Sequence, residues 1–251
     1  MPIEPPPDLF TATPALRRDG YAFCAAGAVR AALERETSLT DWATFAASWN
    51  ALVPDHYLAA SGRRRQRRHA VYSIGRHGDA NREAHQPHYQ SRTYNALQGG
   101  IERWFEPILP QQAGGCLQRV IRLGRDLFGT LAPTVEAWRV EAHQFRIEAL
   151  ADAAGEPTPE GVHRDGVDYV LVMMVDRLNI DAGTTTIHGL DGALLGSFTL
   201  TRPFDVALVD DHRVFHGVTP VTPHDPTQPA HRDVLVVTYR HVEPGSNGIS
   251  G

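Results

Sequence analysis

The sequence contains no lysine: all 24 of its basic residues, in a chain of 251, are arginine. This absence excludes enzymes that hold pyridoxal phosphate on a Schiff-base lysine, and aldolases that form such a base with their substrate. It also excludes P-loop NTPases and protein kinases, whose phosphate-binding lysine has no counterpart here. Any anion that this chain binds must therefore be held by arginine, histidine, hydroxyl groups or backbone amides.

Cysteine and long apolar runs are also scarce. The two cysteines, Cys24 and Cys116, form no C-x-x-C pair, and we expect both to be buried thiols. No apolar run is long enough to span a membrane, and Met1–Pro7 is acidic and proline-rich, unlike a signal peptide. The sequence therefore predicts a cytoplasmic protein, and its formal net charge of -5 argues against general binding to nucleic acid or anionic membranes.

The chain divides into two parts of different character within what we expect to be a single domain, residues 1–251. Residues 1–132 are predicted to be mainly helical, after a loose proline-rich arm over residues 1–13. Residues 133–243 are predicted to form a β-rich core, followed by a flexible tail over residues 244–251. Helices followed by strands favour an α+β fold, and the density of short strands favours a sandwich or barrel.

The individual elements follow from composition and period. Helices are predicted over 25–36, from an N-cap at Asp41, and over 116–129. The predicted strands are 138–150, 168–175, a hairpin of 184–189 with 193–200, 206–209 and 234–239. In the second strand, Val170, Val172 and Met174 share one face and Leu171, Met173 and Val175 share the other. One of these faces is expected to line the functional site, and the sequence does not decide which.

Thirteen histidines prompted a search for the spacing of metal ligands. His163 and Asp165 are two residues apart, so on an extended segment both side chains point to one face. A second histidine, His216, lies at the end of a later strand-like run. Two histidines and one carboxylate form the facial triad of non-haem Fe(II) oxygenases, which leaves positions open for an oxoacid and dioxygen. Arg232 opens the last strand, where its planar guanidinium could hold a carboxylate.

These residues lie in runs that resemble a known family. The runs Pro159–Gly166, Leu208–Asp211, His216–Pro220 and Arg232–Leu235, with Tyr94-Asn95 and Gly99–Arg103, resemble Fe(II)/2-oxoglutarate dioxygenases. The similarity is to the bacterial hydroxylases of free L-amino acids, which include L-isoleucine 4-hydroxylase, and it spans roughly residues 60–240.

The resemblance implies a double-stranded β-helix (jelly-roll, cupin-like) core with the N-terminal helices packed on one side. It implies His163, Asp165 and His216 as the metal ligands and the catalytic centre, with Fe(II), 2-oxoglutarate and O2 as cofactor and cosubstrates. Arg232 would bind the distal carboxylate of 2-oxoglutarate. Because Asp165 is present, a halogenase, which needs that position vacant, is disfavoured.

Other candidates are less specific. Gln90, Arg92, Tyr94 and Asn95 are predicted to contact the substrate, although structural roles are equally compatible with their positions. The arginine cluster Arg63–Arg68 has three interpretations: a solvated loop, an anchor for a substrate carboxylate, or a nucleic-acid contact, against which the negative net charge argues. Arg240 is a rival to Arg232 for the oxoacid.

We therefore expect a dioxygenase that hydroxylates an unactivated C–H bond of an aliphatic L-amino acid, free or N-modified, releasing succinate and CO2. The same iron chemistry giving desaturation, cyclisation or epimerisation is an alternative, and so is a non-enzymatic, cupin-like protein that binds a metal and a small acid. The expected partner is a small-molecule amino acid, with no nucleic acid and no membrane, and a homodimer is compatible with the sequence.

Overall fold

One large antiparallel sheet organises the molecule. The computed structural model describes residues 7–59, 64–95 and 97–243. The strands of the sheet follow the order β1 (Tyr21–Cys24), β12 (Val206–Asp210), β8 (Tyr169–Leu178), β15 (Ala230–His241), β7 (Ala137–Ala149), β3 (Arg65–Gly75) and β2 (Val53–Pro54), and β4 (Asn81–Arg82) also pairs with β3. The last strand, β15, therefore lies in the middle of the sheet, between β8 and β7.

Smaller sheets complete the β structure. The second layer contains β11 (Leu194–Thr199), β10 (Thr184–Gly189) and β13 (Val214–Val218), paired in that order. Two-stranded pairs are formed by β9 (Ile180–Ala182) with β14 (Val221–Pro223), and by β5 (His88–Tyr89) with β6 (Glu102–Arg103). Together they form the predicted jelly-roll core.

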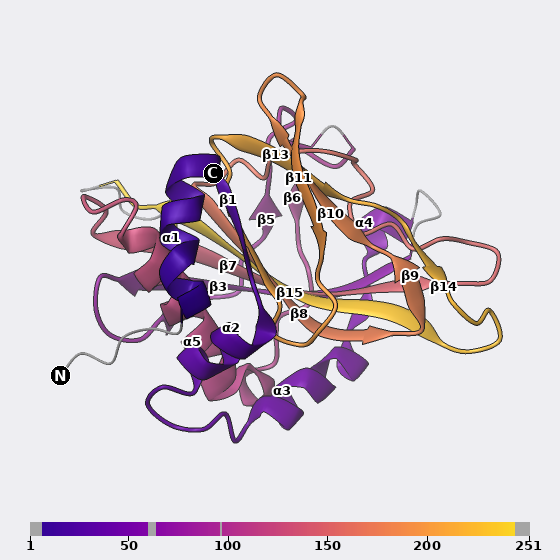
Figure 1. The fold of residues 1–251 in the computed structure, drawn as a ribbon. Coiled ribbons are helices and arrows are strands. Elements are labelled where there is room, and N and C mark those ends of the chain that lie inside the picture. Colours follow the sequence, from indigo (N-terminus) through magenta and orange to yellow (C-terminus); the bar gives the residue numbers. More distant parts are fainter. Residues whose placement is uncertain (1–6, 60–63, 96, 244–251) are drawn as a thin grey trace.

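Helices cover one face of the large sheet (Figure 1). They are α1 (Pro7–Asp19), α2 (Ala26–Leu33), α3 (Trp42–Ala47), α5 (Pro110–Gly129) and the short 3-10 helix η1 (Ser48–Ala51), whereas α4 (His56–Ala59) lies apart from them (Figure 1). In the longest of them, α5, Leu117, Val120, Ile121 and Phe128 are buried on one side. Within the ranges that the structure describes, no helix combines the length and the hydropathy needed to cross a bilayer.

The alternation of side chains gives the large sheet two different faces. Leu171, Met173 and Val175 of β8 belong to the hydrophobic core under the helices. Val170 and Val172 of the same strand point to the other face and line a cavity between the two layers. Of the two faces of this strand, the face with Val170 and Val172 therefore lines the cavity.

Residues 1–132 are less helical than predicted, because they contain β3, a strand of 11 residues that lies inside the main sheet. Its cavity face carries Arg65, Arg67 and His69 where a core strand would have apolar residues, so the period-2 hydrophobic pattern is missing. Arg65, Arg67 and Arg68 therefore belong to a strand of the main sheet, and the interpretation of the cluster as a loop is wrong for them. Arg63 lies outside the described residues.

Two smaller predictions are also corrected. Residues 7–13 belong to α1 and do not form a loose arm. Asp41 is the N-cap residue of α3, as predicted, but its side chain makes no capping hydrogen bond, and its carboxylate accepts a bond of 2.8 Å from the backbone N–H of Cys116 in α5. Burial of Cys24 and Cys116 is confirmed. The predicted tail, residues 244–251, and residues 1–6 fall outside the described part of the chain.

Candidate metal and cosubstrate site

The structure brings His163, Asp165 and His216 together at the mouth of the cavity. The segment before β8 pairs with β13 through a single β-bridge, in which the backbone N–H groups of His163 and His216 each donate to the other's carbonyl at 2.9 Å. One oxygen of Asp165 lies 3.7 Å from Nε2 of His163, and the other lies 3.4 Å from Nε2 of His216. One ligand atom from each residue lies within 4.8 Å of the other two.

These distances fit a shared divalent cation. Ligand atoms bound at about 2.0–2.2 Å around one metal are separated by roughly 3 Å or more, depending on the angle between the bonds. The pKa of Asp165 is well below its usual range: burial opposes this, but hydrogen bonds from the two histidines outweigh it. An ionised carboxylate with two imidazoles is the donor set of non-haem Fe(II) sites. The three residues could therefore hold iron.

A fourth ionisable group adjoins this set and was missed in the sequence. Glu160 lines the cavity, and its Oε1 lies 3.3 Å from Nε2 of His163. Burial lowers the pKa of His163, but Asp165 and Glu160 more than offset it and raise the pKa to about 9. Metal binding would displace that proton, since a ligating imidazole must be neutral.

Hydrogen bonds to Asp211 hold the turn that carries Asp165. The buried carboxylate of Asp211 accepts hydrogen bonds from the backbone N–H groups of Asp165, Gly166 and Val167 at 2.9, 2.7 and 3.2 Å. Gly166 has φ +77°, and a Cβ atom on it would lie 2.4 Å from the ring of Tyr94. Only glycine fits this position, so the turn and the packing of Tyr94 depend on each other.

Gln90 reaches the Asp165 carboxylate from the side. Its Nε2 donates to Asp165 Oδ1 at 3.2 Å, and its Oε1 accepts from Arg103 Nη2 at 2.8 Å and from Asn95 Nδ2 at 3.2 Å. A guanidinium has only donors, so the atom facing Arg103 must be the amide oxygen. The orientation of the Gln90 amide is thereby fixed with its N–H group toward Asp165.

Arg232 lines the same cavity and has unpaired hydrogen-bond donors. Its side chain is 2 % exposed, and its Nε and Nη2 atoms have no hydrogen-bond partner among the described residues. Burial, with the nearby charge of Arg177, lowers the pKa of Arg232 to about 10, so the group is still a cation at neutral pH. An unpaired buried cation is costly, and a carboxylate ligand would remove that cost. The rival, Arg240, is exposed and donates to the carbonyl of Gly166 at 2.7 Å.

The remaining predicted residues divide by position. Gln90 and Asn95 line the cavity. Tyr94 packs against the Gly166 turn, and Arg92 is exposed beside Gly100. One part of the cavity wall is aliphatic and is formed by Ile147, Val167, Val170, Val172, Ala207, Val209, Val218, Val234 and Val236.

Comparison with known proteins identifies the family of this chain. Residues 46–238 match the 2OG-Fe dioxygenase family. The 3(1)-hydroxy-L-isoleucine 4-dioxygenase of Pantoea ananatis (strain AJ13355) is 26% identical over 239 residues, which are 91% of this chain and 94% of that enzyme.

Two solved structures are similar over nearly the whole chain. A BsmA homologue from Methylobium petroleophilum PM1 has a TM-score of 0.82 and 37% identity, covering 95% of each chain. IDO from Bacillus thuringiensis has a TM-score of 0.76 at 17% identity, covering 97% of this chain and 99% of that one, and shows the shared fold. The family match spans most of the chain, and the protein is therefore a member of the 2OG-Fe dioxygenase family, enzymes that use Fe(II), 2-oxoglutarate and O2.

Proposed function

We propose that this dioxygenase hydroxylates an unactivated C–H bond of an aliphatic L-amino acid, with release of succinate and CO2. The observation that carries the proposal is a single cavity that contains the His163–Asp165–His216 set, the unpaired guanidinium of Arg232 and an aliphatic patch of nine side chains. The similarity to an enzyme named for an isoleucine derivative supports an aliphatic amino acid as the substrate class.

Each group then has a distinct role. His163, Asp165 and His216 would hold the iron, which with 2-oxoglutarate supplies the oxidising power. Arg232 binds the distal carboxylate of 2-oxoglutarate through its free donors. The valine-rich wall excludes water and holds an apolar side chain near the metal ligands, and this positioning is the protein's own contribution to rate and regioselectivity.

The test is a panel of aliphatic L-amino acids incubated with the enzyme, Fe(II), 2-oxoglutarate and ascorbate. We expect succinate release coupled to a product 16 Da heavier than one of these substrates. If 2-oxoglutarate binds the iron-loaded enzyme but no member of the panel is oxidised, the proposed substrate class is wrong.

Another oxidative outcome would use the same residues. Desaturation would give a product 2 Da lighter and epimerisation would leave the mass unchanged, so the product masses from the same panel distinguish these outcomes. The non-enzymatic alternative is withdrawn, because the chain belongs to a family of dioxygenases. A cytoplasmic location, a single domain and a homodimer stay predictions.

A further inference from the structure

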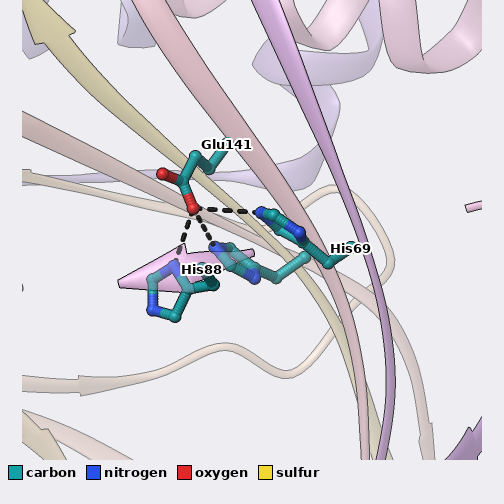
Figure 2. Close-up of side chains that lie close together, drawn as sticks. His69, His88 and Glu141 are labelled. Carbon is teal, nitrogen blue, oxygen red and sulfur yellow. Dashed lines mark hydrogen bonds and ion pairs between the residues drawn. The ribbon is translucent and has the colours of Figure 1, made fainter. Parts of the chain in front are cut away.

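A second cluster of ionisable side chains lies apart from the proposed iron ligands, and three of its four members, His88, Glu141 and His143, line the cavity. It comprises His69, His88, Glu141 and His143, from strands β3, β5 and β7. Glu141 Oε2 accepts hydrogen bonds from His69 Nε2 at 3.0 Å and from His88 Nδ1 at 2.7 Å (Figure 2). Residues of these types at such distances are also typical of a metal site.

The geometry favours hydrogen bonding over metal binding. The 2.7 Å contact between Glu141 and His88 is shorter than the spacing of roughly 3 Å expected for two ligands of one metal. In the proposed iron site the corresponding distances are 3.4 and 3.7 Å. His143 Nδ1 lies 2.6 Å from Arg67 Nη2, which can only donate, so the proton of the neutral ring is on Nε2. That nitrogen faces Glu141 and is unavailable to a metal.

Arg67 is the cationic counterpart of this cluster. Its side chain is 3 % exposed, and its guanidinium lies over the rings of Phe105 and Phe145 at 3.5 and 4.6 Å. Nε of Arg67 has no hydrogen-bond partner among the residues described. The nearest acid, Asp55, is 3.6 Å away and is already paired with Arg65 at 2.9 Å. One carboxylate thus serves two buried guanidinium groups, and a second anion would be favourable here.

His143 prevents Arg67 and Glu141 from pairing directly. The imidazole ring lies between them, with Nδ1 2.6 Å from Arg67 Nη2 and Nε2 3.8 Å from Glu141 Oε2. A buried cation and a buried anion are therefore held apart by the width of one ring, and both line the cavity. Glu141 Oε1 also lies 3.4 Å from Arg139 Nη2, on the carboxylate oxygen that the histidines leave free. A zwitterion that spans the ring would place an opposite charge beside both Arg67 and Glu141, with hydrogen bonds of about 2.8 Å at each end.

The pair is close to the iron site but separate from the 2-oxoglutarate arginine. On β5 and the residue after it, His88 contacts Glu141 and Gln90 contacts Asp165, and residues two apart on a strand are about 7 Å apart. Strand β7 pairs with β3 along one edge and with β15 along the other. Arg67 of β3 is opposite Phe145, whereas Arg232 of β15 is opposite Ile147. A ligand held at Arg67 and Glu141 could therefore extend an aliphatic side chain toward the metal ligands without displacing 2-oxoglutarate.

We propose that Arg67 binds the α-carboxylate and Glu141 the α-ammonium group of a free α-amino acid. This inference rests on the proposed function and narrows it, since an N-acylated amino acid or a peptide lacks one of the two charges. The valine-rich wall would select among amino acids by the shape of their side chains. Arg67 and Glu141 would bind the α-carboxylate and α-ammonium groups of each of them in the same way.

The test measures binding rather than turnover. The enzyme is loaded with Fe(II) and 2-oxoglutarate under nitrogen, and ligand binding is followed by the change in the iron–2-oxoglutarate charge-transfer band and by calorimetry. The probes are L-isoleucine, L-leucine and L-valine, together with the carboxamide of each, which lacks the negative charge, and the desamino acid of each, which lacks the positive one.

For the wild-type enzyme we expect the best amino acid to bind about 10- to 100-fold more tightly than its carboxamide or its desamino acid. Arg67→Gln should abolish the discrimination against the carboxamide, and Glu141→Gln the discrimination against the desamino acid. Arg67→Lys, which keeps the charge, should retain part of the preference and serves if Arg67→Gln folds poorly.

Arg68→Gln is the matched control on the same strand. Arg68 donates to the carbonyls of Ala51 and Pro107 and is not a cavity residue, so its variant should keep the wild-type discrimination. An intact charge-transfer band shows that each variant still holds iron and 2-oxoglutarate.

Two results would overturn the inference. If Arg67→Gln weakens binding of the acid and the carboxamide equally, or if the wild-type enzyme oxidises an amino acid without preferring it over the carboxamide, the anchor is wrong and the proposed function stands. If the wild-type enzyme retains the band but neither binds nor oxidises any amino acid, both are wrong.

Discussion

The hydrogen bond from Gln90 to Asp165 gives a prediction that separates two roles for this residue. Gln90→Met keeps the length of the side chain but removes its amide. It thereby removes the 3.2 Å bond to Asp165 Oδ1 and the acceptor used by Arg103 Nη2 and Asn95 Nδ2. If Gln90 orients the metal ligand, the loss falls on metal binding. If it contacts the amino acid, as the sequence suggested, the loss falls on substrate binding.

The expected size follows from the number and type of bonds lost. Removing an outer hydrogen-bond partner of a metal ligand lowers metal affinity about 10- to 100-fold, equivalent to about 1.4–2.8 kcal/mol. Leaving the buried donor of Arg103 unpaired costs the folded state about 1–3 kcal/mol in addition. Gln90→Met should therefore bind Fe(II) about 10- to 100-fold more weakly and unfold at a lower denaturant concentration.

The assay is an anaerobic competition titration of Fe(II) against a chelator of known affinity, followed by steady-state kinetics at saturating iron. Gln98→Met is the matched control, because Gln98 accepts from the other terminal nitrogen of Arg103 at 2.8 Å and does not contact Asp165. It should lose stability without losing metal affinity. Unchanged iron affinity in Gln90→Met, with a raised KM for the amino acid, would refute a positioning role and support substrate contact.

Three further predictions test other parts of the site. Arg232→Ala should raise the KM for 2-oxoglutarate about 30-fold or more while iron stays bound, since a buried charged partner is lost, whereas His163→Ala should abolish iron binding; equal metal loss in both variants would contradict the assigned roles. Gly166→Ala should lower the free energy of unfolding by about 1–3 kcal/mol from its φ of +77° alone, measured by urea denaturation, and an unchanged midpoint would show that the turn adapts. Burial lowers the pKa of His69 to about 4, although the hydrogen bond to Glu141 raises it. Below about pH 6.5 the imidazole of His69 is therefore protonated in the unfolded chain but stays neutral in the folded one. The contribution of His69 to the free energy of unfolding should thus fall by about 2 kcal/mol between pH 7 and pH 5, and the difference between wild type and His69→Gln in urea titrations at both pH values measures it.

That His163, Asp165 and His216 lie together could be predicted from sequence because the information is local. His163 and Asp165 are two residues apart, and His216 lies in a short strand-like run, so spacing and residue type were sufficient. The fold class followed from the β-branched runs and from the family resemblance, and it is confirmed by the double-layered antiparallel sheet.

The other end of the cavity could not be found this way, because its strand violates the usual pattern. β3 is buried, yet it presents Arg67 and His69 where a core strand presents apolar residues. Their partners, Glu141 and His143, are more than 70 positions away and are brought opposite only by the pairing of β3 with β7. A long-range register of this kind leaves no local signal in one sequence.

The central position of β15 has a consequence for how this enzyme becomes active during its synthesis. Among the described strands β15 is made last, yet it joins β8 with β12 and β1 on one side to β7 with β3 and β2 on the other. Until Ala230–His241 has emerged, these are two separate sheet fragments with exposed edges. The strand that unites them also carries Arg232, so the sheet closes and the arginine proposed to bind 2-oxoglutarate arrives in one event. A chain interrupted before Ala230 would therefore expose two unpaired edges to aggregation or proteolysis, and it would contain His163, Asp165 and His216 without Arg232.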